Sequence, residues 1–256
     1  MSFPKTIYAG YGFEKVIDAT KKYTFGQRLE TPDGRIFRYI KAGATGLVAG
    51  KLYTGGSGQV ADTMYLDKLV CGSAAVGATA VTITTGGTTA VAVKFYDDGW
   101  LHTSSSADGG VGEVYRIKSA ASAAAASAQS IVSFEDGEQI ATAIQGGTTK
   151  VGMRKNQYDG LEIYPASTTA IGPLAGVAVS PVPASSFGWI QRRGPAPAYS
   201  ESGTLMIASA PVSAGTSAAG AIDEWLGVAS STQIIGTVMT AAGTSKIFGV
   251  VDLSIE

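Results

Sequence analysis

Residues 27–41 of this 256-residue chain read QRLETPDGRIFRYIK, and this stretch indicates the fold class. Two arms, 27–30 and 35–41, flank the tetrapeptide TPDG. Pro32 fixes φ early in the turn, and Gly34 accepts the left-handed position that such a turn needs. The stretch therefore predicts a β-hairpin.

The same pattern extends outward along the chain. A second hairpin is predicted around Gly86 and Gly87, with β-branched arms at 81–85 and 88–93. Other short alternating or apolar runs, mostly bounded by Gly or Pro, predict strands at 113–118, 150–153, 161–164, 176–179, 187–191, 204–208, 234–239 and 247–255. Short strands at this spacing are typical of barrels and sandwiches. We therefore expect an all-β protein whose barrel or sandwich core consists of many short antiparallel strands.

Two segments do not fit the strand pattern, and they shape the predicted organisation. Residues 11–22 carry Phe13, Val16 and Ile17 at helical spacing, which suits a short amphipathic helix or an arm lying on a neighbour. Residues 119–130 are nearly all Ala and Ser and lack large apolar anchors, which favours a flexible connector over a docked helix. The expected divisions are an N-terminal arm or helix at 1–25, a β-rich half at 26–118, the connector at 119–130 and a second β-rich half at 131–256 that shares one core with the first.

The composition narrows the possible partners. The chain has 19 Lys and Arg against 20 Asp and Glu, so its formal net charge is -1. Nucleic acid and anionic membranes bind preferentially to proteins with an excess of positive charge, so neither is expected as a partner. The chain shows no leader pattern and no uninterrupted apolar run of about 18 residues, which predicts a protein that is made in a cytoplasm and stays soluble.

The residues that usually carry chemistry are scarce. Cys71 and His102 are the only cysteine and histidine, so an intrachain disulfide is excluded and a zinc site, which takes at least three protein ligands, is not expected. The sequence contains no Gly-x-Ser-x-Gly motif that would supply a serine nucleophile for His102, so a catalytic triad is not expected either. The glycine-rich runs at 55–58 and 109–112 lack the Lys and the helix of a phosphate loop and are interpreted as turns.

Acidic pairs offer one further possibility. Neighbouring carboxylates at 97–98, 135–136 and 223–224 would point to opposite faces of a strand, so they suit solvated turns better than a glycosidase acid and base. The turns at 97–99 and 135–138 could supply oxygen ligands to Ca²⁺, although neither matches the EF-hand pattern. We therefore expect no enzyme, no cofactor and no metal site.

Two groups of residues are candidates for contacts with other chains. The N-terminal segment carries Tyr8, Tyr11, Phe13 and Tyr23 before the first hairpin, so it could form an arm across a neighbouring subunit. The alternative is that these rings complete the core of their own chain.

The second group is the pair Arg192 and Arg193, which could bind acidic side chains of a partner through planar guanidinium hydrogen bonds. The alternative for this pair is a solvated strand end.

A set of segments, in this order along most of the chain, resembles the head decoration, or cement, proteins of tailed bacteriophages. The segments are residues 31–43, 47–52, 96–101, 110–117, 156–161, 188–194 and 235–238. The resemblance implies a β-rich protein that binds the outside of an assembled capsid, often as a trimer at three-fold positions, and stabilises the shell against internal DNA pressure.

The resulting expectation is a non-enzymatic virion structural protein that is synthesised in the host cytoplasm and clamps neighbouring major capsid subunits from the outer capsid surface. Its expected partners are the major capsid protein and further copies of itself in a homotrimer, since only 15% of its residues are charged and weakly polar patches usually mark contacts. The alternative is a carbohydrate- or receptor-binding module of a tail or fibre, in which Trp100, Trp189 or Tyr158 would stack on sugars.

Overall fold

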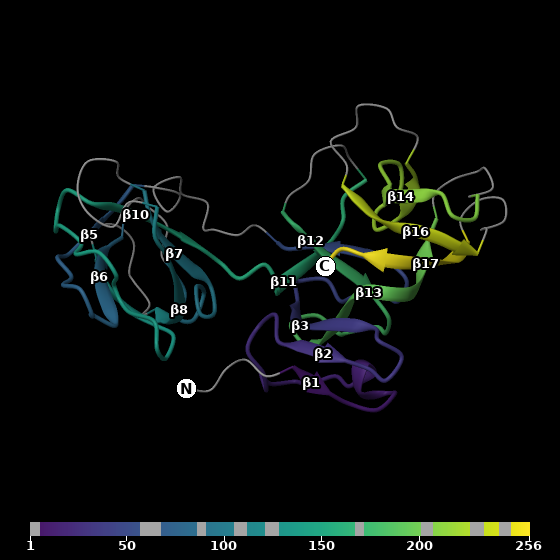
Figure 1. The fold of residues 1–256 in the computed structure, drawn as a ribbon, viewed down its shortest axis with the longest axis horizontal. Helices are drawn as coiled ribbons and strands as arrows, with labels where there is room; N and C mark the ends of the chain where they lie inside the picture. Colours follow the sequence, from purple (N-terminus) through teal and green to yellow (C-terminus); the bar gives the residue numbers. More distant parts are fainter. Residues whose placement is uncertain are drawn as a thin grey trace. The chain divides into compact units, whose positions relative to one another are not determined.

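The computed structural model describes residues 6–56, 68–85, 91–104, 112–120, 128–166, 172–200, 207–225, 233–240 and 247–256. These residues form strands β1 to β17 and the 3₁₀ helix η1, which confirms the all-β prediction (Figure 1). The chain divides into two compact units. Residues Ser57–Asn156 form the inserted unit, while Ser2–Gly56 and Gln157–Glu256 together form the discontinuous unit.

The inserted unit is a closed barrel. Its antiparallel strands follow the order β10-β5-β6-β9-β8-β7, and β7 pairs with β10 to close the ring. The strand bounds are β5 Leu69–Cys71, β6 Ala80–Thr84, β7 Trp100–Thr103, β8 Val114–Ala120, β9 Gln129–Phe134 and β10 Lys150–Arg154.

Side chains alternate around this barrel between a buried interior and the outer surface. Leu101, Tyr115 and Met153 belong to the buried hydrophobic cluster, whereas Trp100 and Val114, which alternate with them, are exposed. This is the period of two expected of strands with one buried face.

The discontinuous unit contains a second closed ring of strands, in the order β3-β11-β4-β12-β13 and back to β3. Beyond β13 the sheet continues through β17, β16 and β14 to β15; at the other end β2 pairs with β3, and β1 pairs with β2. The element bounds are β1 Ile7–Tyr8, η1 Phe13–Lys15, β2 Arg28–Glu30, β3 Ile36–Ala42, β4 Leu52–Thr54, β11 Asp159–Ile163, β12 Leu174–Ala178, β13 Phe187–Tyr199, β14 Pro211–Ala214, β15 Ile222–Glu224, β16 Ile234–Thr240 and β17 Phe248–Ser254.

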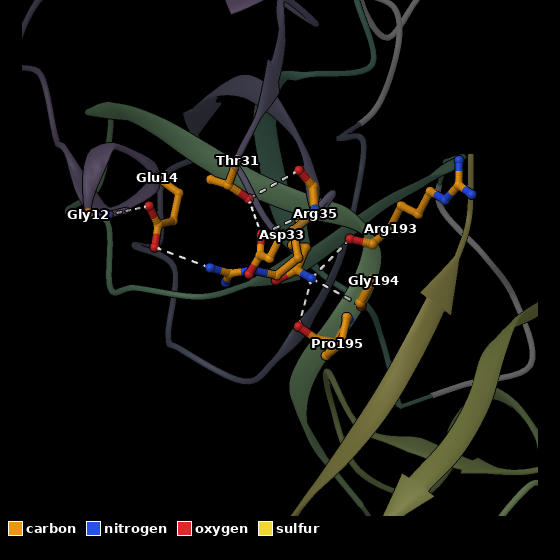
Figure 2. Close-up of polar contacts among 9 residues, drawn as sticks. Gly12, Glu14, Thr31, Asp33, Arg35, Arg193, Gly194 and Pro195 are labelled. Carbon is orange, nitrogen blue, oxygen red and sulfur yellow. Dashed lines mark hydrogen bonds and ion pairs between the residues drawn. The ribbon is translucent and has the colours of Figure 1, made fainter. Parts of the chain in front are cut away.

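Strand β13 belongs to both parts of this unit. Its first half pairs with β3 and β12, and its second half pairs with β17. At the transition Gly194 has a φ of 85°, a value that glycine adopts without strain. The buried Gln191 holds the bend because its Nε2 donates to the carbonyl oxygens of Arg193, Gly194 and Pro195, at 3.0, 3.0 and 2.9 Å (Figure 2).

The first predicted hairpin is confirmed. Strands β2 and β3 pair antiparallel, the N–H of Gly34 donates to Thr31 O at 2.9 Å, and Gly34 has a φ of 80°. The predicted strands near β8, β10, β11, β12, β13, β16 and β17 are also present.

Of the second predicted hairpin, the first arm is present as β6, but the predicted pairing of its two arms is wrong. Residues 86–90 lie outside the described residues, but Val91, Ala92 and Val93 form no strand. Both edges of β6 are occupied, by β5 and by β9, so Val91, Ala92 and Val93 do not pair with it. Of the predicted strand at 204–208, the first three residues lie outside the described part, and Ile207 and Ala208 precede β14 without belonging to a strand.

The predicted domain boundaries are also corrected. Residues 119–120 belong to β8 and 129–130 to β9, which are antiparallel neighbours in one barrel, while 121–127 lie outside the described residues. The two predicted halves do not form a single core: both contribute side chains to each of three hydrophobic clusters, of which one fills the inserted barrel and two lie in the discontinuous unit. The division falls elsewhere because β3 and β4 pair with β11 and β12 across the whole inserted sequence.

Candidate interaction surface

The N-terminal segment is part of its own unit, which corrects the expectation of a free arm for residues 6–25. Residues 1–5 lie outside the described residues. Ile7 pairs with Leu29 in a parallel ladder, and Asp18 and Phe187 exchange two backbone hydrogen bonds of 2.9 Å each. These contacts fix the segment at two separate points.

The four N-terminal aromatic residues have different surroundings. Phe13 and Tyr23 pack against Trp189, with ring centroids 6.0 and 5.6 Å away. These two rings therefore complete the core of their own chain, as the alternative interpretation held. Tyr8 and Tyr11 remain 77% and 65% exposed, so only these two are available to another chain.

A polar network joins η1 to the turn between β2 and β3 (Figure 2). The buried Glu14 accepts a hydrogen bond from the N–H of Gly12 at 2.7 Å and lies 3.8 Å from the Arg35 guanidinium. Arg35 Nε in turn donates to Asp33 Oδ2 at 2.7 Å, and Thr31 Oγ1 donates to Asp33 Oδ1 at 2.6 Å. Burial raises the pKa of Asp33, but the hydrogen bonds from Thr31 and Arg35 outweigh burial, so the pKa is lowered. The network stabilises the turn in its ionised form.

Arg192 and Arg193 are separated by the alternation of the strand. Arg192 Nη1 donates to the carbonyl oxygens of Leu174 and Ala175 at 2.9 and 3.1 Å, and its side chain is only 12% exposed. Arg192 therefore serves its own unit, and the prediction that it contacts a partner is not supported. Arg193 is exposed, its guanidinium has no partner among the described residues, and its side chain in Figure 2 points away from the network.

The outer side of β13, β17 and β16 gathers exposed, weakly polar side chains. Pro195 lies opposite Asp252, Pro197 opposite Val250, and Tyr199 opposite Phe248. Val250 in turn lies opposite Thr240, next to the exposed Met239. We call this surface the β13–β17–β16 face. Its weakly polar members are Pro195, Pro197, Tyr199, Met239, Phe248 and Val250.

The opposite side of these strands is buried. Ala196, Ala198, Val238, Val251 and Leu253 all belong to one hydrophobic cluster. The inner side chains of the sheet form the core. On the outer side Phe248 and Val250 remain exposed, although Phe248 also packs against the ring of Tyr199, 5.5 Å away. Surfaces of this kind on soluble proteins commonly mark contacts.

Sequence reasoning missed this face. The alternation at 247–255 signals that Phe248 and Val250 share a side, but only the register shows which residues of β13 and β16 stand beside them. Pro195 and Pro197 gave a partial signal, since proline in a strand indicates an edge. Within the described residues, β13 pairs beyond Gly194 with β17 alone.

The aromatic candidates for sugar stacking are divided in the same way. Trp189 and Tyr158 are buried, whereas Trp100 is 39% exposed.

The described residues contain no group of three or more His, Cys, Asp and Glu side chains that could hold a metal ion. In the same part of the chain, no helix is long and apolar enough to span a membrane.

No family model matches the chain, and no curated protein or solved structure matches it.

Proposed function

We propose that this chain is a non-enzymatic structural protein of a phage virion that binds the outer capsid surface and clamps neighbouring major capsid subunits. The observation that carries the proposal is the β13–β17–β16 face, where exposed apolar side chains lie on three paired strands. The order of segments that resembles phage head decoration proteins supports the same function.

The chemistry of the face suits a repeating protein lattice. Pro197, Val250 and Phe248 offer apolar area at about 25 cal/mol for each Å² buried. Arg193, which lies opposite Ser254 at one end of the face, offers a free guanidinium to a carboxylate of the capsid. Modest contacts of this kind add up when several copies of the chain bind together, which is the reason for proposing a homotrimer.

The second candidate, a carbohydrate- or receptor-binding module, has less support as the main function. Of its three proposed stacking residues, Trp189 and Tyr158 lie in the core and only Trp100 has an exposed ring.

The test is co-sedimentation of the purified protein with capsids that lack it. The wild-type protein is expected to bind in a saturable manner, and the charged substitution Val250→Asp in the centre of the face is expected to weaken binding about tenfold or more. Val114→Asp, which changes another exposed strand valine in the inserted unit, is the matched control and should bind as the wild type does. Absence of saturable binding by the folded wild type would overturn the function, and equal binding by Val250→Asp would overturn the choice of face.

A further inference from the structure

The inserted unit carries a second candidate site on the outer side of its barrel. Trp100 of β7 lies directly opposite Arg116 of β8 on one side and opposite Arg154 of β10 on the other. The alternating neighbours Leu101, Tyr115 and Met153 are buried, so the residues of this row point outward, and we call Arg116, Trp100 and Arg154 the Trp100 row.

The backbone before Trp100 is tightly held. The N–H of Gly99 donates to Tyr96 O at 3.0 Å, and the carbonyl oxygen of Gly99 accepts from the N–H of Ile117 at 2.9 Å. A Cβ at Gly99 would overlap the carbonyl oxygen of Arg154, so only glycine allows β7 and β10 to approach this closely here. Trp100 therefore starts from a fixed backbone, which lowers the entropic cost of using its ring for binding.

Of the two arginines beside Trp100, Arg116 contacts the indole ring. The Arg116 guanidinium lies over the Trp100 ring, 5.3 Å from its centroid. Within the described residues no other cation or aromatic ring contacts Trp100, and Arg154 is exposed and forms no ion pair. The row thus offers an indole surface beside an unpaired guanidinium.

This combination selects among ligand classes. An indole surface packs well against the apolar face of a sugar ring, and a guanidinium binds a carboxylate through two parallel hydrogen bonds. Single-stranded nucleic acid uses several aromatic rings for successive bases, and the row has one. An acidic peptide side chain would use the arginines without the ring.

We propose that the Trp100 row binds a carboxylate-bearing sugar of the uronic acid class, with the sugar ring on Trp100 and the carboxylate at Arg154. The site goes beyond the proposed capsid function, because it lies in the inserted unit and shares no residue with the β13–β17–β16 face.

The experiment is calorimetric titration of the full chain with trigalacturonate, and with maltotriose as the neutral sugar. Saturable binding of trigalacturonate is expected, with a loss of detectable binding in Trp100→Ala and about tenfold weaker binding in Arg154→Gln. Phe248→Ala and Arg193→Gln are the matched controls, since they remove an exposed ring and an exposed guanidinium from the other unit. Circular dichroism of each variant establishes that it is folded.

Several outcomes would overturn the proposal. These are no saturable binding by the wild type, equal binding of maltotriose, undiminished binding in folded Trp100→Ala or Arg154→Gln, or tighter binding of oligothymidylate or polyglutamate than of trigalacturonate. Capsid binding is measured separately: Val250→Asp, which is expected to weaken capsid binding, should bind trigalacturonate as the wild type does.

Discussion

Arg192 and Ile255 are joined by two hydrogen bonds that run in opposite directions: Arg192 Nη2 donates to Ile255 O at 3.0 Å, and the N–H of Ile255 donates to Arg192 O at 3.1 Å. The carboxylate of the next residue, Glu256, pairs with Arg38 of β3. The end of β17 is thereby fixed to the closed ring of the discontinuous unit.

We predict that Arg192→Ala lowers the free energy of unfolding of this unit by about 2–4 kcal/mol, because it leaves three carbonyl oxygens without their charged donor. The neighbouring exposed Arg193→Ala should change it by less than about 0.5 kcal/mol. Urea unfolding of both variants checks the prediction, and similar losses in the two would contradict the inward role of Arg192.

Two glycines give a matched pair for strand packing. A Cβ at Gly236 of β16 would overlap the carbonyl oxygen of Asp252 on β17, whereas a Cβ at Gly10 meets nothing within 4 Å. Gly236→Ala should destabilise the protein by about 3 kcal/mol or more, since two paired backbones must separate. Gly10→Ala should be close to neutral, and thermal melting of the two variants decides. Equal melting temperatures would contradict the register of β16 and β17.

The N-terminal rings allow a test of whether residues 6–25 belong to the core. Tyr23 packs on Tyr39 and Trp189, with centroids 5.1 and 5.6 Å away, while Tyr11 is exposed. We expect Tyr23→Ala to cost about 1–3 kcal/mol of folding free energy and Tyr11→Ala almost none. If Tyr23→Ala leaves the urea midpoint unchanged, the segment is not part of the folded core.

The barrel contains a tyrosine, Tyr115, whose raised pKa should make the stability of the protein depend on pH in the alkaline range. Burial, and then the hydrogen bond that Tyr115 donates to Glu113, raise the pKa of Tyr115 to about 12 from an ordinary value of 10.0. Because the pKa is raised in the folded protein, the stability that the neutral Tyr115 hydroxyl contributes to folding is fully present below pH 10 and is lost as the pH rises towards 12. Tyr115→Phe should therefore be less stable than the wild type by about 1 kcal/mol at neutral pH.

Unfolding of wild type and Tyr115→Phe across the alkaline range tests the sign. The difference between them should shrink as the pH approaches 12. A difference that stays constant through that range would show that Tyr115 ionises as an ordinary tyrosine does.

The inserted unit has its own closed barrel and its own hydrophobic cluster, so residues 57–156 should fold when expressed alone. Circular dichroism of the fragment is expected to show β structure and a cooperative melt. A fragment without cooperative melting would mean that the barrel depends on the rest of the chain.

Local sequence patterns determined the all-β class and the first hairpin. The alternation of apolar residues and the TPDG turn act within a few residues, so the strands near 27–41 could be placed without knowing their distant partners. The predicted pairing in the second hairpin was wrong because two glycines between β-branched arms indicate a turn but do not determine which strand occupies the edge beside β6.

Only the tertiary structure decided the division of the chain and the contents of the candidate sites. Pairing of β4 with β12 joins residues separated by the entire inserted barrel, and no local signal in the chain encodes that contact. The same holds for the cross-strand row of Trp100 between two arginines and for the inward turn of Arg192 beside the outward Arg193. The alternation of a strand fixes which residues share a side, but the register of its neighbours fixes what stands next to them and which side faces a core.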